Sequence, residues 1–167
     1  RQLLQKTRNL SNSLDSQFSD FSEISDLKLL KEQLCLSPSD FGFHNMLIKS
    51  DCSTKFIDFE YAGWDDPAKL LCEFVLHPAM KLDLYEARVF IDRIDIEGID
   101  PSWLRSRCQN LFGYALIRWV CIILNLFLPA HLERKLFANP SLNIVESKSK
   151  QVEKAEIMVS NFERNPF

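Results

Sequence analysis

Hydrophobic residues follow a helical spacing in the first part of the chain. From residue 1 to about residue 20 the apolar side chains recur at mostly helical intervals among polar residues, at Leu3, Leu4, Leu10, Leu14, Phe18 and Phe21. This spacing predicts an amphipathic helix. The next stretch, 19–26, is rich in Ser and Asp, and Ser25 or Asp26 is suited to cap a short helix that runs through Leu30.

Short apolar runs replace the helical spacing in the middle of the chain. Residues 45–48 and 55–59 form two such runs, separated by the polar residues 49–54. Two short apolar segments around a polar turn predict a small β-hairpin. A third run, 34–36, comes earlier, and the loop 37–44 leads from it into the hairpin.

From residue 66 onward the pattern indicates helices. Asp66-Pro67 and Asp100-Pro101 each place a capping carboxylate before a proline at the first helical position. Two of the expected helices end just before a later proline, which cannot continue a helix. The predicted helices cover 67–77, 84–94 and 101–127, and a last helix is marked by Val152, Ala155, Val159 and Phe162.

The apolar run 111–128 is long enough to be weighed as a membrane span. Its eighteen residues are near the lower limit for crossing a bilayer. However, Arg118 lies near its middle, and a central arginine costs about 2.5–3.5 kcal/mol even on the insertion scale that penalises charge least. The pattern therefore favours a buried helix at the centre of a helical lobe, with a membrane-anchored module as an alternative.

Length and composition predict one domain over residues 1–167. The chain is 46% hydrophobic, with thirteen phenylalanines, and is long enough to bury a core. Its formal charge of -3 argues against nucleic acid as a partner, because such binding calls for clustered Lys and Arg.

The five cysteines are widely spaced, odd in number and without a C-x-x-C pair. A zinc cluster is therefore poorly supported. Because most of them lie in apolar runs, we expect buried, reduced thiols in a cytoplasmic protein.

Oxygen-bearing side chains gather around the predicted hairpin. Asp40 is followed five residues later by Asn45, and Asp58 comes thirteen residues after Asn45, at the end of the second strand. A hairpin from 45 to 58 brings its two ends together beside the loop that carries Asp40. Phosphoryl transfer needs such a set, namely a carboxylate for the attacking hydroxyl and oxygen ligands for Mg²⁺.

This stretch resembles the aminoglycoside phosphotransferase and choline-kinase-like family, whose pattern is roughly H-G-D-x-x-x-x-N, a hairpin, and then I-D-[WF]-E-x-A-G-x-G-D-P-A. The matching segments here are SPSDFGFHN, Ile57-Asp58-Phe59-Glu60, Ala62-Gly63-Trp64 and Asp66-Pro67-Ala68. The resemblance implies the C-terminal lobe of a protein-kinase-like (α+β) fold, mainly α with a small β-hairpin. It divides the chain into a catalytic loop, 36–45, a metal-binding hairpin, 45–60, and a helical substrate-side region, 66–167.

The resemblance also implies a role for each matched residue. Asp40 would be the catalytic base, Asn45 and Asp58 the magnesium ligands, and Asp66 a structural cap that orders the loop after the metal site. ATP or GTP would be the phosphoryl donor, and the acceptor a hydroxyl group of a small molecule. The acceptor pocket would lie among the helices after Asp66, with the turn 74–80 and the long helix around Arg118.

The chain departs from the family pattern in two ways. Pro38 stands where the family has a loop histidine that braces the catalytic loop, although a proline can stiffen the loop through its fixed φ. No Gly-rich loop or strand lysine precedes Asp40, so we expect the nucleotide-binding N-terminal lobe to lie elsewhere in a parent chain. The chain alone is then expected to bind ATP weakly and to be inactive.

A catalytically degenerate scaffold that binds a partner is the alternative function, favoured by these departures. Other residues near the motif receive plainer interpretations. His44 is read as a packing or capping residue of the loop, Trp64 as a packing anchor, and Gly42 and Gly63 as turn residues. Glu60 is either a partner of a metal ligand or a solvent-facing loop residue.

Overall fold

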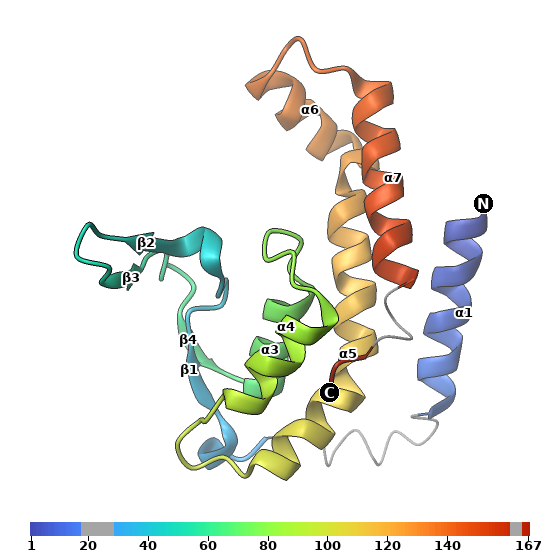
Figure 1. Cartoon of the computed structure of the whole chain (residues 1–167). Coiled ribbons are helices and arrows are strands. Elements are labelled where there is room, and N and C mark those ends of the chain that lie inside the picture. Colours follow the sequence, from blue (N-terminus) through green and yellow to red (C-terminus); the bar gives the residue numbers. More distant parts are fainter. Residues whose placement is uncertain (18–28, 161–164) are drawn as a thin grey trace. The chain divides into compact units, whose positions relative to one another are not determined.

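The computed structural model describes residues 1–17, 29–160 and 165–167 (Figure 1). These residues are mainly helical with two small antiparallel sheets, which confirms the prediction of a mainly α chain with a small hairpin. In chain order the elements are α1 (Gln2–Gln17), η1 (Lys31–Gln33), β1 (Cys35–Ser37), η2 (Phe43–Asn45), β2 (Met46–Ile48), β3 (Thr54–Phe56), β4 (Gly63–Asp65), α3 (Pro67–Leu76), α4 (Leu84–Arg93), α5 (Pro101–Ile123), η3 (Leu124–Phe127), α6 (Pro129–Ala138) and α7 (Ile144–Ser160).

The chain forms two compact units. One comprises Phe18–Ala115 with Pro166–Phe167, and the other Arg1–Gln17 with Leu116–Asn165, within the ranges that the structure describes. The predicted caps Ser25 and Asp26, and the predicted helix positions Phe18, Phe21 and Phe162, lie outside the described residues.

The predicted hairpin is present in the first of these units, which contains the candidate site. Strands β2 and β3 pair antiparallel, with Met46 opposite Phe56, and project as a narrow ribbon in Figure 1. A second sheet was not predicted: β1 pairs antiparallel with β4, so that Leu36 lies opposite Trp64. Because three-residue strands carry almost no periodic signal, only the pairing with a distant segment identifies them.

Helix starts follow the predicted caps. The Asp66 side chain accepts a hydrogen bond of 2.9 Å from the backbone N–H of Ala68 at the start of α3. Asp100 in the same way accepts a 2.7 Å bond from the backbone of Trp103 in α5. Helix α3 ends at Leu76, immediately before His77 and Pro78, as its sequence predicts.

Other helix boundaries differ from the predictions. The predicted helix 101–127 is α-helical only to Ile123 and continues as the 3-10 turn η3. Helix α6 was not predicted at all; it begins at Pro129, and none of its residues is fully buried.

Buried aromatic packing anchors the predicted catalytic loop to the helices. The Phe74 side chain of α3 is 2% exposed. Its ring centroid lies 4.3 Å from that of Phe90 on α4, 5.2 Å from Phe41 and 5.5 Å from Phe43. Because Phe41 and Phe43 follow Asp40 closely, the position of the loop depends on this core.

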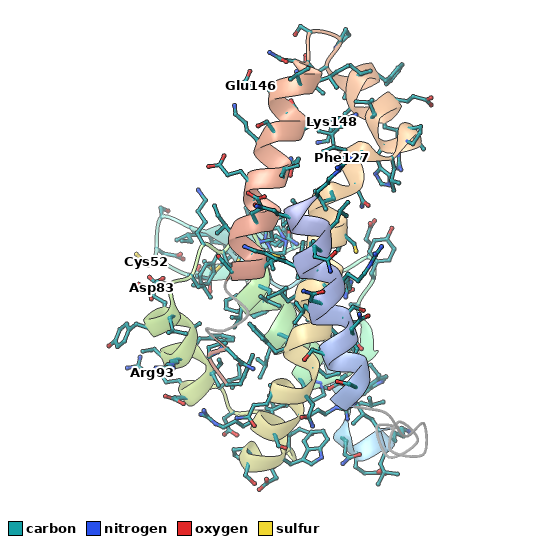
Figure 2. All side chains as sticks on the ribbon, turned by 90° about the vertical axis from the view of Figure 1, so that its right-hand side faces the viewer. Cys52, Asp83, Arg93, Phe127, Glu146 and Lys148 are labelled. Carbon is teal, nitrogen blue, oxygen red and sulfur yellow. The ribbon has the colours of Figure 1, made fainter. Side chains whose placement is uncertain are left out.

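In the other unit, a cation–π contact between Lys148 of α7 and Phe127 of η3 joins these two elements. The Lys148 ammonium lies 5.1 Å from the centroid of the Phe127 ring, and both side chains are labelled in Figure 2. Lys150 also pairs with Glu146 at 2.6 Å on the exposed surface of α7. Because both side chains of this ion pair are exposed, it contributes little to stability.

One helical stretch among the described residues, Pro101–Phe127, has the length and apolar composition of a membrane span. A core helix of a soluble protein meets the same criteria, so the choice between a buried helix and a membrane-anchored module stays a prediction.

All five cysteines are free thiols. Cys72 and Cys108 are buried, whereas Cys52 and Cys121 are exposed and Cys35 is half-buried. The prediction that most of them are buried is therefore wrong, because a short apolar run can lie on the surface of a small sheet or helix. Burial and the neighbouring Asp65 raise the pKa of the Cys35 thiol, which makes it a poor nucleophile at neutral pH.

The Asp66 carboxylate combines helix capping with an ion pair. Its Oδ2 lies 2.8 Å from Nη2 of Arg107, and both side chains are largely buried, 13% and 11% exposed. Asn can still cap a helix, whereas Ala cannot. We therefore expect Asp66→Asn to lower the free energy of unfolding by about 1–3 kcal/mol through loss of the charged partner. Asp66→Ala should cost about 1 kcal/mol more.

Urea unfolding of the two Asp66 variants measures both effects. Equal stability of the Asn and Ala variants would show that the cap contributes nothing to α3.

Candidate functional site

A tight turn presents Asp40 at the end of strand β1. The Asp40 N–H donates to the carbonyl of Pro38 at 2.9 Å, and Ser39 between them has a φ of 70°. The hydroxyl of Ser37, a residue 2% exposed, accepts a bond from the Ser39 N–H. These contacts describe a γ-turn with a left-handed central residue, a conformation that is rare and strained. Pro38 is thus the first residue of this turn, and its predicted stiffening role stays a prediction.

Asn45 closes the loop that follows Asp40. Its side chain is buried, and its Nδ2 donates to the Asp40 carbonyl at 2.9 Å and lies 3.4 Å from Oδ2 of the Asp40 carboxylate. The Asn45 N–H bonds the Gly42 carbonyl at 3.1 Å. The structure thus brings Asp40 and Asn45 together, with the amide nitrogen committed to Asp40 and the amide oxygen as the donor atom that a cation can use.

Asp58 stands at the open end of the hairpin, as predicted. The Ile57 N–H donates to the Asn45 carbonyl at 2.9 Å, so Asp58 follows the backbone bond that joins the two strand ends. Its φ is 67°, in the left-handed region that Asp tolerates better than most residues. The residue is exposed, and its carboxylate is not part of the side-chain cluster around Asp40 described next.

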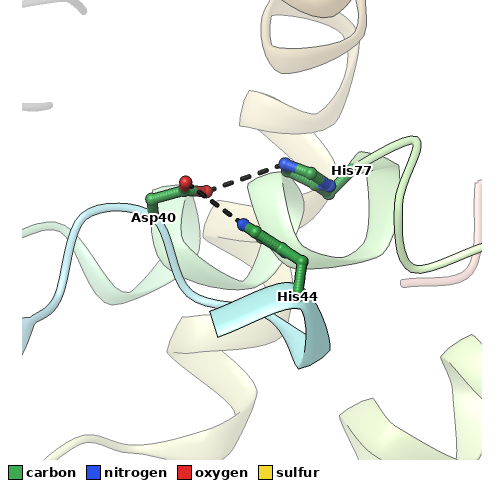
Figure 3. Close-up of side chains that lie close together, drawn as sticks. All are labelled: Asp40, His44 and His77. Carbon is green, nitrogen blue, oxygen red and sulfur yellow. Dashed lines mark ion pairs between the residues drawn. The ribbon is translucent and has the colours of Figure 1, made fainter. Parts of the chain in front are cut away.

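Two histidines flank the Asp40 carboxylate (Figure 3). His44 Nε2 lies 3.1 Å from Oδ2, and His77 Nε2 lies 3.6 Å from Oδ1. The two imidazole rings stack with centroids 4.4 Å apart and planes 11° from parallel. Among the described residues, these three form the group of His, Cys, Asp and Glu whose ligand atoms all lie within 4.8 Å of one another.

Sequence reasoning did not find this cluster. His44 was read as a loop residue, although its spacing of four from Asp40 could have indicated a contact. His77 follows α3, where it was expected only to end the helix; its contact with a residue 37 positions earlier leaves no local signal.

The proton of neutral His77 has a defined place. The Ala79 N–H donates to His77 Nδ1 at 3.1 Å, so neutral His77 carries its proton on Nε2, the nitrogen that faces Asp40. Burial first, and then the neighbouring His44, lower the pKa of His77, while Asp40 acts in the opposite direction. The neutral ring is therefore the favoured form near neutral pH.

An apolar cavity is lined by residues close in sequence to the two histidines of the cluster. It has a volume of about 450 Å³ and is lined by Phe43, Phe74, Leu82, Tyr85, Glu86, Val89, Phe90, Arg93 and Ile94. Phe43 precedes His44, and Phe74 is on the last turns of the helix that leads to His77. Phe74 of the predicted acceptor pocket lines this cavity. Arg118, which was also predicted near the pocket, belongs to the other unit of the chain.

Two of the plainer interpretations are corrected by the structure. Trp64 is 69% exposed on β4, so it is not a packing anchor. Gly63 lies within the same strand rather than in a turn. Gly42 begins the turn that the Asn45 N–H closes, as predicted, and it also allows close packing: an added Cβ would lie 2.7 Å from His44 Nδ1 and 2.7 Å from Met80 Cε. Glu60 is exposed.

Replacing Gly42 by Ala should therefore disturb the cluster. Because the new methyl group would overlap the His44 ring, we expect a loss of about 1–3 kcal/mol in the free energy of unfolding and a displacement of His44 from Asp40. Denaturant unfolding and the imidazole NMR signals of His44 measure these effects. Gly63→Ala is the matched control, because its Cβ would meet nothing within 4 Å. Equal stability of both variants would contradict the packing role of Gly42.

Comparison with protein-family models, with curated proteins and with solved structures finds no match to this chain. The function is therefore argued from the residues and their geometry.

Proposed function

We propose that this chain carries the catalytic loop and metal-binding hairpin of a magnesium-dependent phosphotransferase that acts on a hydroxyl group of a small molecule. The observation that carries the proposal is Asn45, whose side-chain Nδ2 donates to the Asp40 carbonyl while its backbone carbonyl accepts the Ile57 N–H. One buried residue thus couples the proposed base to the hairpin end that bears Asp58.

Each residue has a chemical task in this proposal. The Asp40 carboxylate accepts or orients the proton of the attacking hydroxyl. The Asn45 amide oxygen and the Asp58 carboxylate are hard oxygen donors, which suits them to Mg²⁺. Bound there, the ion would neutralise charge on the phosphates of ATP or GTP. The exposed Asp58 carboxylate can reach a cation without breaking any hydrogen bond that orders the loop.

The acceptor is proposed to place its apolar part in the cavity beside Phe43. Aromatic walls with a few polar groups are typical of small-molecule sites, and Glu86 and Arg93 supply polar groups here. No basic loop for the nucleotide phosphates is part of the proposed site. We therefore propose that a nucleotide-binding lobe outside this chain completes it, in the cytoplasm and without nucleic acid or membrane as partners.

Binding of Mn²⁺ together with ATP tests the metal site. Mn²⁺ replaces Mg²⁺ and broadens NMR signals of nearby nuclei, so the backbone amides of Asn45 and Asp58 should broaden first. Asp58→Asn keeps the left-handed backbone and removes the charge. It should raise the Mn²⁺ concentration needed for the same broadening by about tenfold, which corresponds to about 1.4 kcal/mol of binding free energy. Asp51→Asn, at the turn end of the same hairpin, is the control and should leave the Mn²⁺ response unchanged, since within the described part of the chain the Asp51 carboxylate bonds Ser53 of the same turn.

Broadening that is equal in the wild type and in Asp58→Asn would refute the assignment of Asp58 as a ligand.

The scaffold alternative draws support from an exposed apolar pair on the small β1–β4 sheet. Leu36 and Trp64 lie opposite each other across the sheet, and each is 69% exposed. Large exposed apolar side chains often mark a protein interface. If the chain is a scaffold, Trp64→Ala will abolish partner binding while Asp40→Asn leaves the protein's function unchanged.

A further inference from the structure

A catalytic carboxylate on an exposed loop needs partners that fix its direction. The Asp40 side chain is 52% exposed, and Asn45 reaches its Oδ2 only at 3.4 Å. A productive geometry has to be held to about 0.5 Å, because larger displacements slow a reaction steeply. Pro38, at the position of the bracing histidine in the resembling family, has no side-chain donor to supply this restraint.

The two histidines provide one nitrogen for each carboxylate oxygen. His44 Nε2 is within hydrogen-bond distance of Oδ2, at 3.1 Å. His77 Nε2 lies 3.6 Å from Oδ1, too far for a hydrogen bond in this state but close enough that a small movement of the exposed carboxylate would form one. Figure 3 shows both nitrogens directed at the carboxylate from the same side.

The His77 ring is held at the end of α3, and the His44 ring is held by its contacts with His77 and Gly42. His77 follows α3, where its N–H bonds the Phe74 carbonyl at 3.3 Å and its ring accepts from Ala79. The His44 ring stacks on His77 and fits against the space left by Gly42. Because α3 is packed into the core through Phe74, the stack connects Asp40 to the core of its unit.

A neutral donor is the suitable partner for a base. A cation at the position of His77 would favour the ionised carboxylate and weaken its affinity for a proton. The lowered pKa of His77 keeps this ring neutral, so it can orient Asp40 without adding a charge.

The same three side chains could instead hold a transition-metal cation such as Zn²⁺, since their ligand atoms lie within 4.8 Å of one another. The bond at Ala79 argues against this. An imidazole that binds a metal through Nε2 carries its proton on Nδ1, and in His77 that nitrogen receives the Ala79 N–H. Metal binding through Nε2 of His77 would place the Nδ1–H of His77 against the N–H of Ala79.

We infer that His77, with His44 stacked on it, is a positioning residue that orients the Asp40 carboxylate for phosphoryl transfer. The inference rests on the proposed function. It assigns to a residue 37 positions downstream of Asp40 the bracing task that Pro38 cannot perform.

Rescue by a conservative variant separates positioning from a general structural role. In the complete phosphotransferase, His77→Ala should lower kcat by about 10- to 100-fold with little change in the KM for the nucleotide. His77→Gln, whose amide can still donate toward Asp40, should recover most of this loss. His131→Gln, a substitution of a histidine in the other unit, is the control and should leave kcat unchanged.

Two readouts keep this test apart from that of the proposed function. If the Asp40→Asn variant keeps full turnover, the proposed function is wrong. If the Asp40→Asn variant is inactive while the His77→Ala variant is fully active, only the positioning role of His77 is wrong. Histidine ¹⁵N NMR of the chain should show the Nε2–H form of His77, and a dominant Nδ1–H form would overturn the inference. A rise in Tm with Zn²⁺ that disappears in His77→Ala would also overturn it, in favour of a metal site.

Discussion

Asp40→Asn should reduce phosphotransfer turnover by about 100-fold or more. A carboxylate that accepts the proton of the attacking hydroxyl typically contributes 10²- to 10⁴-fold, and an amide cannot accept that proton. The backbone carbonyl of residue 40 keeps its bond from Asn45, so the loop should remain closed. Steady-state assays of the complete protein with Mg²⁺, ATP or GTP, and a panel of small alcohols measure the effect.

The stability of the Asp40 variant distinguishes loss of chemistry from loss of fold. Because the Asp40 side chain is half exposed, its thermal unfolding should be close to that of the wild type. Asp51→Asn, at the turn end of the hairpin, is the matched control and should retain full turnover. Wild-type turnover in Asp40→Asn would leave the scaffold as the better explanation of the fold.

Phe74→Ala should cause the largest loss of stability, about 3–5 kcal/mol. Its buried ring contacts Phe41 and Phe43 of the proposed catalytic loop and Phe90 of α4, and the smaller side chain would leave a cavity among them. The loop should also lose its fixed position, because it is attached to the helices through these contacts. Urea unfolding gives the free energy, and amide hydrogen exchange of residues 40–45 reports the loosening of the loop.

Phe137→Ala is the matched control for Phe74. The Phe137 side chain is 92% exposed on α6, so the same substitution should change the free energy of unfolding by no more than about 0.5 kcal/mol. A loss of less than about 1 kcal/mol in Phe74→Ala would show that the aromatic cluster does not hold the loop.

Local sequence signals predicted the elements whose causes are themselves local. Asp66 and Asp100 cap their helices because a carboxylate reaches the free N–H groups of the next turn. The hairpin formed because two short apolar runs flank a polar turn in which Asp51 accepts bonds from Ser53. Asn45 and Asp40 met because a spacing of five allows a side chain to bond back across one loop.

Local sequence signals did not predict the elements that depend on a partner distant in the chain. Strand β1 exists through its pairing with β4, almost thirty residues later, and α6 was missed in a part of the chain where none of its residues is fully buried. Trp64 looked like a packing residue but is exposed, because hydrophobicity alone does not say which side of a short strand meets the core.

The amino-acid sequence by itself determined the hairpin, the helices α1, α3, α4 and α5, the caps at Asp66 and Asp100, and the neighbourhood of Asp40, Asn45 and the backbone of Asp58. Only the tertiary structure decided that His77 faces Asp40, that Phe74 anchors the loop, and that Gly42 leaves space for His44. The physical reason is range: capping and turn bonds act over a few residues, whereas side chains from separate elements meet only when the core has packed.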